Sequence, residues 1–361
     1  MKKMSNRERI INTGLCKEVD RLPFFVFFGP WGETVERWRD EGLNPDLNWD
    51  AEFGFDEGII CMSVNLGYCP AFEEKVLEVK DNTRIVQSPL GIIQEERLQG
   101  SSIPRYIEYP VKNASDWEEL KKKLNPDDPA RFPDNWAQLV KEYNEGDKAV
   151  QLGTYPYGLF GTLRDMMGVE ELLVTFYDDP ELIHDMMDYL TDFWLAIYGK
   201  VAKEVKIDII HIWEDMSGCH GPLISPKMIR EFMMPNYIKI KRFADANGIP
   251  ILSLDTDGDC TKLVPLFMES GINLIFPFEV AAGSDIVDYR REYPDLSIMG
   301  GIDKRELTMD KIEIDRELER VKEVFKYPGY FPALDHLIHP QISLENFRYF
   351  VQKLREMIGV D

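Results

Sequence analysis

Strand-length apolar segments alternate with helical segments along most of this chain, and this alternation limits the fold more than any other feature. Strands that alternate with helices pair in parallel, and eight units of this kind favour a closed barrel over a doubly wound sheet. We therefore expect an α/β fold, a (β/α)8 TIM barrel, in a single domain of residues 1–361. The eight segments are 24–28, 58–64, 149–155, 207–215, 249–255, 272–279, 296–303 and 329–336.

The pattern changes between the second and third of these segments. Three short stretches, 75–79, 83–87 and 91–96, alternate apolar and polar residues, and Asp81-Asn82 forms a turn signal between two of them. These features predict an antiparallel β insertion near residues 73–109.

The charge balance limits the partners of the chain. Lys and Arg number 42 against 64 Asp and Glu, which gives a net charge of −22. Nucleic acid and anionic membranes repel such a protein. The N-terminus has no apolar signal core, and no run reaches the roughly 20 apolar residues that span a bilayer. We expect a cytoplasmic protein that binds neither nucleic acid nor membrane.

The five cysteines are scattered and include no Cys-x-x-Cys pair, which argues against a disulfide scaffold or a zinc ribbon. Glycine-rich phosphate loops and the Gly-x-Ser-x-Gly motif are also missing, so ATP use and serine hydrolysis are disfavoured. The acids that follow Leu254 do not fit a calcium EF-hand. That loop needs a glycine at its sixth position and a glutamate at its twelfth, whereas Gly258 is fourth and Leu266 is twelfth.

Acidic residues gather where the last five predicted strands end. In a barrel enzyme the carboxyl ends of the strands carry the functional side chains. Three acids within residues 255–259 repel one another unless a cation, a proton or a substrate group compensates their charge, although a solvated turn is the simpler alternative. The strand-end residues are Glu214, Asp215, Asp255, Asp257, Glu279, Asp303, Asp335 and His336.

These residues suggest a metal site. Asp255 and Asp257 leave one strand, Glu279 follows the next, and His336 supplies a nitrogen ligand from the last. Carboxylate-rich ligation favours a hard or borderline divalent ion, zinc or similar. A packing role for His336 is the alternative, and the in-strand His211 is expected to be a core residue.

The remaining strand-end residues suggest how a substrate would be held. Glu214, Asp215 and Asp303 are candidate catalytic residues that orient the substrate. Aromatic residues near the same strand ends would form an apolar wall for substrate binding, although aromatics there also serve simply as packing. They are Trp31, Tyr155, Tyr157 and Trp213.

Four short motifs follow one another along the chain. They are Asn-Arg-Glu-Arg-Ile leading to Asp-Arg-Leu-Pro at 6–23, Pro-Leu-Ile-Ser-Pro at 222–226, Gly-Gly-Ile-Asp at 300–303 and His-Pro-Gln-Ile-Ser-Leu-Glu-Asn at 339–346. With them the chain resembles the uroporphyrinogen decarboxylase superfamily over nearly its whole length. The resemblance implies a (β/α)8 barrel, in agreement with the strand count.

This superfamily contains tetrapyrrole decarboxylases and methyltransferases that use cobalamin or coenzyme M. The decarboxylases carry an Arg-Gln-Ala-Gly-Arg loop after the first strand, where this chain has Phe-Phe-Gly-Pro-Trp at 27–31 and its next arginine is Arg37. An acidic pocket without those arginines would repel a substrate rich in carboxylates. The chain is therefore more similar to the methyltransferase branch.

The methyltransferase branch holds a thiol-activating zinc with a His-x-Cys pair and a later Cys. When the sequences are aligned on Gly258, the pair falls on Asp255 and Asp257, and the later Cys falls on or next to His336. The positions match and the ligand types differ. Carboxylates and histidine would suit a divalent ion that polarises an oxygen or nitrogen substrate.

The resemblance leads to three hypotheses. The first is metal-assisted methyl transfer between a small methylated substrate and a corrinoid protein or thiol acceptor. The corrinoid would be carried by a partner, because this chain lacks the cobalamin-binding Asp-x-His-x-x-Gly motif. The second is decarboxylation of a tetrapyrrole or other carboxylic acid without metal. The third is a non-catalytic ligand-binding or accessory barrel. Association into a homo-oligomer is a further expectation from the family.

Overall fold

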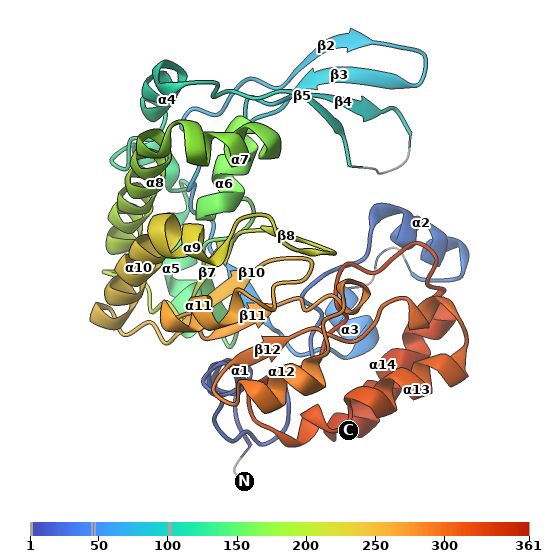
Figure 1. The fold of residues 1–361 in the computed structure, drawn as a ribbon. Coiled ribbons are helices and arrows are strands. Elements are labelled where there is room, and N and C mark those ends of the chain that lie inside the picture. The colour runs from blue at the N-terminus through green and yellow to red at the C-terminus, as the bar shows by residue number, and fades with distance from the viewer. Residues whose placement is uncertain (1–2, 45, 47, 100–102, 361) are drawn as a thin grey trace.

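A computed structural model describes residues 3–44, 46, 48–99 and 103–360. These residues form an α/β fold in which a curled parallel sheet is covered by helices on its outer side (Figure 1). Seven strands of the described residues build this sheet in chain order. They are β1 (Ile59–Cys61), β6 (Ala149–Leu152), β7 (Ile209–Trp213), β10 (Ile251–Asp255), β11 (Leu274–Phe276), β12 (Ser297–Met299) and β13 (Tyr330–Phe331).

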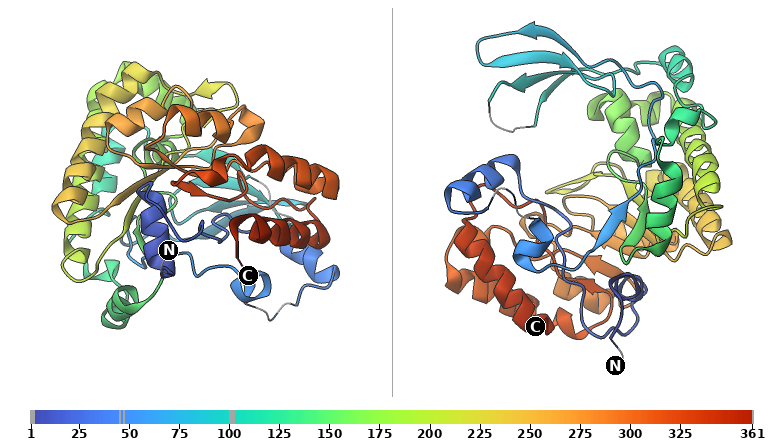
Figure 2. Two further views of the ribbon diagram at one scale, coloured as in Figure 1. Left: turned by 90° about the horizontal axis from the view of Figure 1, so that it is seen from below. Right: turned by 180° about the vertical axis from the view of Figure 1, so that it is seen from behind.

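Helices follow the strands as the alternating pattern predicts, with α6 and α7 as two that the pattern did not predict. Figure 2 shows both ends of the chain on the side of α1, away from the antiparallel sheet. No described helix is both long and apolar enough to span a membrane. The helices are α1 (Asn6–Gly14), α2 (Gly32–Asp40), α3 (Trp49–Phe53), α4 (Ala114–Lys121), α5 (Trp136–Glu145), α6 (Leu159–Met167), α7 (Val169–Asp178), α8 (Pro180–Val201), α9 (Pro226–Met228), α10 (Met234–Ala246), α11 (Val264–Glu269), α12 (Ile286–Glu292), α13 (Lys311–Val321) and α14 (Leu344–Ile358).

The parallel sheet is buried on both faces, which explains why its strands are continuous apolar runs. Alternate side chains of each strand point inward, as Ile209 and Ile251 do, and fill the inside of the curled sheet. The other side chains, such as Ile210 and Leu252, pack outward against the helices in a larger outer core. The inner core consists of Ile10, Ala149, Ile209, Ile251, Leu274, Phe276, Met299 and Phe331.

The strand predicted at residues 24–28 is not formed, so no β ladder closes the barrel on this side. An isolated parallel bridge pairs Pro30, just after this segment, with Ile338. Phe25, Phe27 and Phe28 still pack against the inner core. An apolar cavity is lined by this segment and by residues 332–334, which follow β13 and begin with Pro332. The bulky rings keep the two backbones apart, and Pro332 has no N–H to donate to a ladder. Packed side chains, and not a hydrogen-bonded strand, therefore fill the place of the eighth strand of the barrel.

The predicted antiparallel insertion is confirmed. Its four strands pair in chain order and project from the body beside α4, α6 and α7 (Figure 1). Residues 100–102, which fall inside the predicted insertion, lie outside the described residues. The strands are β2 (Lys75–Val79), β3 (Thr83–Gln87), β4 (Ile93–Arg97) and β5 (Arg105–Glu108). A separate small hairpin consists of β8 (Ser217–Gly218) and β9 (Gly221–Pro222).

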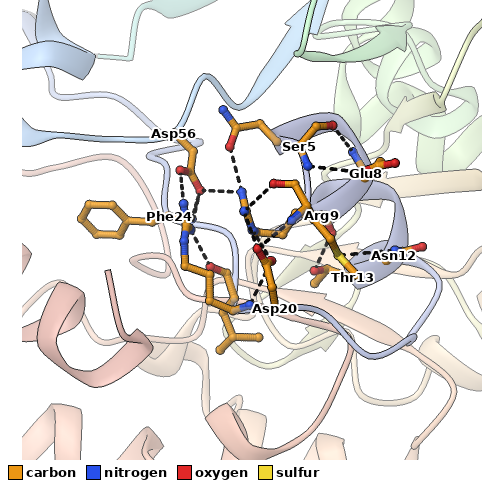
Figure 3. A network of polar contacts seen from close by, with 12 residues as sticks. Ser5, Glu8, Arg9, Asn12, Thr13, Asp20, Phe24 and Asp56 are labelled. Atoms are coloured by element: carbon orange, nitrogen blue, oxygen red, sulfur yellow. Dashed lines mark hydrogen bonds and ion pairs between the residues drawn. The ribbon is translucent and has the colours of Figure 1, made fainter. Parts of the chain in front are cut away.

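Helix α1 covers the amino end of the curled sheet, where Ile10 joins the inner core. Ser5 caps the helix in a reciprocal arrangement with Glu8. The buried guanidinium of Arg9 donates from Nε and Nη2 to the two carboxylate oxygens of Asp20, at 2.9 and 3.0 Å (Figure 3). A second carboxylate, that of Asp56, lies 3.8 Å from Arg9. The charge that α1 buries is thus paired.

Candidate functional site

Three of the predicted metal ligands meet at the carboxyl ends of the parallel strands. Asp257 follows β10, Glu279 follows β11 and His336 follows β13. One ligand atom from each lies within 4.8 Å of the other two. All three side chains are partly exposed, at 32, 22 and 23%. We call these residues the acid–histidine trio.

His336 is oriented by two contacts. Its Nε2 lies 3.3 Å from Oδ2 of Asp257, and its ring stacks on Phe28 with centroids 5.1 Å apart. Burial acts to lower the pKa of His336, but the hydrogen bond to Asp257 and its charge outweigh that effect and raise the pKa above its usual value. Phe28 belongs to the segment in the eighth strand position, so this segment supports the site without being a strand.

Glu279 is held by a backbone donor and by a cation. The N–H of Gly258 donates to Oε2 of Glu279 at 3.0 Å, and Nζ of Lys304 lies 3.5 Å from Oε1. The same Nζ is 4.0 Å from Asp335, whose carboxylate also accepts from the N–H groups of Lys304 and Val280. Sequence reasoning missed Lys304, although a lysine directly after a strand-end acid was a signal that could have identified it.

Asp255 is not part of the trio, although it was predicted as a metal ligand. Its side chain is 9% exposed. Asp255 pairs in register with Trp213 on β7 and with Phe276 on β11. Burial, together with the nearby charges of Asp257, Asp215 and Glu279, raises the pKa of Asp255 well above its usual value.

A second polar group lies next to the trio, at the ends of β6 and β7. Asp215 has a left-handed backbone, with φ of 41°. Its carboxylate pairs with Nη1 of Arg164 at 2.5 Å. The Arg164 guanidinium lies 4.9 Å from the centroid of the Trp213 ring, and Tyr155 meets that ring edge-on at 4.7 Å. Arg164 was not predicted from the sequence.

Glu214, predicted to orient substrate, instead lies fully buried at the start of α6. Its carboxylate accepts from Tyr237 Oη at 2.6 Å and from the N–H groups of Leu159, Phe160 and Gly161 at 2.6 to 3.2 Å. Burial raises the pKa of Glu214 to about 7, despite these bonds. These contacts fix a helix end, which is a positioning role.

Asp303, the third residue predicted to orient substrate, is also paired with another residue of the chain. Its two carboxylate oxygens accept from Nε and Nη2 of Arg305, with the shortest contact at 2.6 Å. Burial acts to raise the pKa of Asp303, but the bonds from Arg305 outweigh it and lower the pKa. The partner lies two residues further along the chain, so this pair stabilises the conformation of the loop after β12.

Two of the predicted aromatic residues make other contacts. The backbone N–H of Trp31 donates to the Ile338 carbonyl at 3.2 Å, and Trp31 is the N-cap residue of α2. Tyr157 lines an inner cavity with Leu66 and Leu190, and Asp165 also lines this cavity. His211 is a core residue, as expected. It is 4% exposed, its Nδ1 lies 3.1 Å from Ser253 Oγ, and burial lowers its pKa to about 3.

The donor set of the trio fits a divalent metal ion. Two carboxylates and one imidazole are ligands that zinc and similar borderline ions accept, and three protein ligands leave a coordination position open, as in catalytic sites. The Lys304 ammonium next to Glu279 compensates one carboxylate, and an ion bound by Glu279 would compete with it. The His336 to Asp257 contact would also give way to metal bonds.

The chain is similar to proteins of known families. Residues 94–357 match the family described as Uroporphyrinogen decarboxylase (URO-D). The chain is 31% identical over 221 residues to a methylated-thiol–coenzyme M methyltransferase of Methanosarcina mazei, covering 61% of this chain and 56% of that protein. It is 23% identical over 194 residues to a uroporphyrinogen decarboxylase of a Hydrogenobaculum species, covering 51% of each. The chain spans about half the length of these curated relatives.

The fold has a counterpart among solved structures. A methyltransferase from Methanosarcina mazei superimposes with a TM-score of 0.62 at 15% sequence identity, and the match covers 98% of this chain and 99% of that one. At this identity the likeness shows a shared fold alone. It supports an α/β fold with a curled parallel sheet.

Proposed function

The chain belongs to the uroporphyrinogen decarboxylase (URO-D) family, and from this premise we propose that it catalyses methyl transfer between a small methylated substrate and a corrinoid protein or thiol acceptor. Within the family it is closer to the methyltransferase branch. It shares 31% identity with a methylated-thiol–coenzyme M methyltransferase and 23% with a uroporphyrinogen decarboxylase.

The observation that carries the proposal is the convergence of Asp257, Glu279 and His336, whose ligand atoms lie within 4.8 Å at the strand ends. These residues would hold one divalent ion. When bound, such an ion supplies Lewis acidity that polarises an oxygen, nitrogen or sulfur atom of a ligand. Phe28 fixes the imidazole plane, and the Gly258 N–H orients Glu279.

The neighbouring group of Asp215, Arg164, Trp213 and Tyr155 would form the wall that positions the substrate. Tyr155 is 59% exposed, so it can meet a ligand from solvent. Arg164 keeps its charge next to Asp215, and the pair presents a fixed dipole at the edge of the wall. The corrinoid, if it is the acceptor, would come on a partner protein.

Decarboxylation is the second candidate, because the chain also matches a curated uroporphyrinogen decarboxylase. The charges around the site favour it less. Arg164 is paired with Asp215, Lys304 with Glu279, and Arg305 with Asp303. Arg37, the arginine after the first predicted strand, pairs with Glu41 and donates to the Pro340 carbonyl. A substrate carboxylate would have to break one of these pairs.

Methyl transfer from methylcobalamin to a small thiol tests the proposal, with free methylcobalamin standing in for a corrinoid protein. We expect the zinc-loaded protein to be active, and removal of metal or the substitution Asp257→Asn to lower the rate at least about tenfold. Zinc should restore the stripped wild type but not the variant. Asp288→Asn, which changes a carboxylate 79% exposed on α12, is the control and should match the wild type.

Absence of methyl transfer by the folded, zinc-loaded protein would favour the decarboxylase. If chelation and Asp257→Asn both leave turnover unchanged, metal-assisted methyl transfer is wrong for this chain. Circular dichroism of each variant separates loss of the site from loss of the fold.

A further inference from the structure

The antiparallel insertion ends in a free edge at β2. Its strands lie in the order β2, β3, β4 and β5, so one side of β2 has no neighbouring strand among the described residues. Figure 1 shows β2 at the outer margin of the insertion. All five of its residues are exposed. The backbone N–H and C=O groups on this side of β2 are therefore open to pairing with another strand.

The same strand carries apolar side chains into solvent. Val76, Leu77 and Val79 are 55, 50 and 65% exposed. An exposed edge that also presents apolar side chains gains doubly from a second strand, through ladder hydrogen bonds and through burial of those side chains.

The charges of residues 73–80 are complementary to the same segment run in the opposite direction. The segment reads Glu-Glu-Lys-Val-Leu-Glu-Val-Lys. When it is paired antiparallel with a second copy about a two-fold axis at Val76 and Leu77, Lys75 lies opposite Glu78 of the second copy. Glu73 lies opposite Lys80 of the second copy, and the symmetry repeats both pairs. No like charges stand opposite one another, whereas a row of lysines would repel itself.

A bulge at Leu77 makes this alignment possible. Lys75 pairs with Gln87 on β3 and Glu78 pairs with Ile85, with a register shift between Val76 and Glu78. Gln87 and Ile85 are two residues apart on β3, so Lys75 and Glu78 point to the same face of the sheet.

Residues that stand opposite one another in a ladder also share a face, so Lys75 can meet Glu78 of a second copy. In a regular strand, residues three apart point to opposite faces, and this pairing would fail. Bulges and charges protect many edges from pairing, but here the bulge places opposite charges where a second copy needs them.

The ion pairs within β2 leave this edge available. Nζ of Lys75 lies 2.6 Å from Glu73, and Nζ of Lys80 lies 3.9 Å from Glu78. All four side chains are 47% exposed or more. Pairs as exposed as these contribute little to stability, so exchanging them for contacts with a second copy costs little.

We infer that residues 73–80 form a self-association edge, at which β2 pairs antiparallel with β2 of a second copy of this chain. The two four-stranded sheets then join into one sheet of eight strands. Main-chain hydrogen bonds supply the affinity, and the pairs of Lys75 with Glu78 and of Glu73 with Lys80 fix the register. The inference goes beyond the proposed methyl transfer and does not depend on it.

Sedimentation of the full chain over a series of concentrations, combined with charge reversal, tests the inference. We expect the wild type to pass from monomer to dimer as its concentration rises. Lys75→Glu should raise the Kd of the dimer at least about tenfold, because two glutamates then face each other at both symmetric positions. Glu78→Lys should weaken the dimer in the same way, through facing lysines.

An equal mixture of the two variants is the decisive sample. Each new charge then faces its opposite, so the mixture should form a heterodimer about as tightly as the wild type associates. Sedimentation of one variant with a fluorescent label, with and without the other, measures this. Recovery of association also shows that both variants are folded. Lys322→Glu is the matched control, because it makes the same charge reversal at a lysine 55% exposed after α13 and should leave the dimer unchanged.

Three results would overturn the inference. One is a wild type that is still monomeric at about 1 mM, which would leave the edge to a different partner. Another is a dimer that Lys75→Glu weakens no more than Lys322→Glu does, which would place the interface elsewhere. The third is a mixture of the two variants that associates no better than either variant alone.

Discussion

At the scale of single residues, Gly258 connects the acid–histidine trio with the β8–β9 hairpin. Its backbone is left-handed, with φ of +73°, and a Cβ there would meet the Ser217 carbonyl oxygen at 2.5 Å. Its N–H orients Glu279, and the next residue, Asp259, donates its N–H to the Gly218 carbonyl at 2.9 Å. Only glycine combines this conformation with this close approach.

We predict that Gly258→Ala weakens both the fold and the metal site. Strain at a positive φ and the clash with Ser217 should destabilise the protein by more than about 1 kcal/mol, and displacement of Glu279 should lower zinc affinity. Urea unfolding and zinc titration measure the two effects. Gly248→Ala is the matched control, because Gly248 has a φ of +66° but open space around its Cβ position.

The control isolates the clash from the backbone strain. Gly248→Ala should lose some stability and leave zinc affinity unchanged. Equal effects of the two substitutions on zinc affinity would show that Gly258 has no special part in positioning Glu279.

Strand ends bring three of the four predicted metal ligands together and leave Asp255 outside the group, and their role as ligands stays a prediction. Asp257, Glu279 and His336 were predicted together because parallel strands end at one edge. The partners of Glu214 and Asp303 could not be predicted, since they depend on where the N-terminus of α6 and the side chain of Arg305 come to lie. A strand-end acid can bind a helix end or an arginine as readily as a ligand.

At the scale of elements, α1 depends on the ion pair between Arg9 and Asp20. Burial acts to raise the pKa of Asp20, but hydrogen bonds from Arg9 and from the Met4 N–H outweigh it and lower the pKa from 3.8 to about 2. Arg9 is 2% exposed and Asp20 14%, so solvent screens this pair little. Figure 3 shows the carboxylate facing the guanidinium.

We predict that Asp20→Asn lowers the free energy of unfolding at pH 7 by about 2 kcal/mol. A depressed pKa means that the stabilisation is complete above the unfolded value near 4 and is lost as the pH falls from about 4 toward 2. Urea unfolding at a series of pH values should show the wild type and the variant converging in this window. A difference that stays constant down to about pH 2 would contradict the ion pair as its source.

The elements also show what an apolar pattern leaves open. The run at 24–28 has the length and composition of a strand, and its rings do enter the inner core. Whether its backbone joins the ladder depends on spacing set by rings on both sides and on Pro332 in the neighbouring chain segment. The antiparallel insertion was easier to predict, because hairpin strands pair with their sequence neighbours.

At the scale of the whole molecule, the curled sheet brings the carboxyl ends of its strands to one rim, where the acids and aromatic residues meet. The alternation of strands and helices predicted this arrangement. It also predicted closure by an eighth strand, which the described residues do not form. A single domain over residues 1–361 and association into a homo-oligomer remain predictions. The central claim is that this rim holds one divalent ion in the acid–histidine trio.

Anomalous diffraction at the zinc edge from crystals of the zinc-loaded protein tests this claim most directly. We predict one strong peak bonded to a carboxylate oxygen of Asp257, a carboxylate oxygen of Glu279 and the Nε2 of His336, each at about 2.0–2.2 Å. Asp255 should lie outside the coordination sphere. A zinc peak held by other residues would contradict the account. So would the absence of a peak at the trio, with His336 still in contact with Asp257.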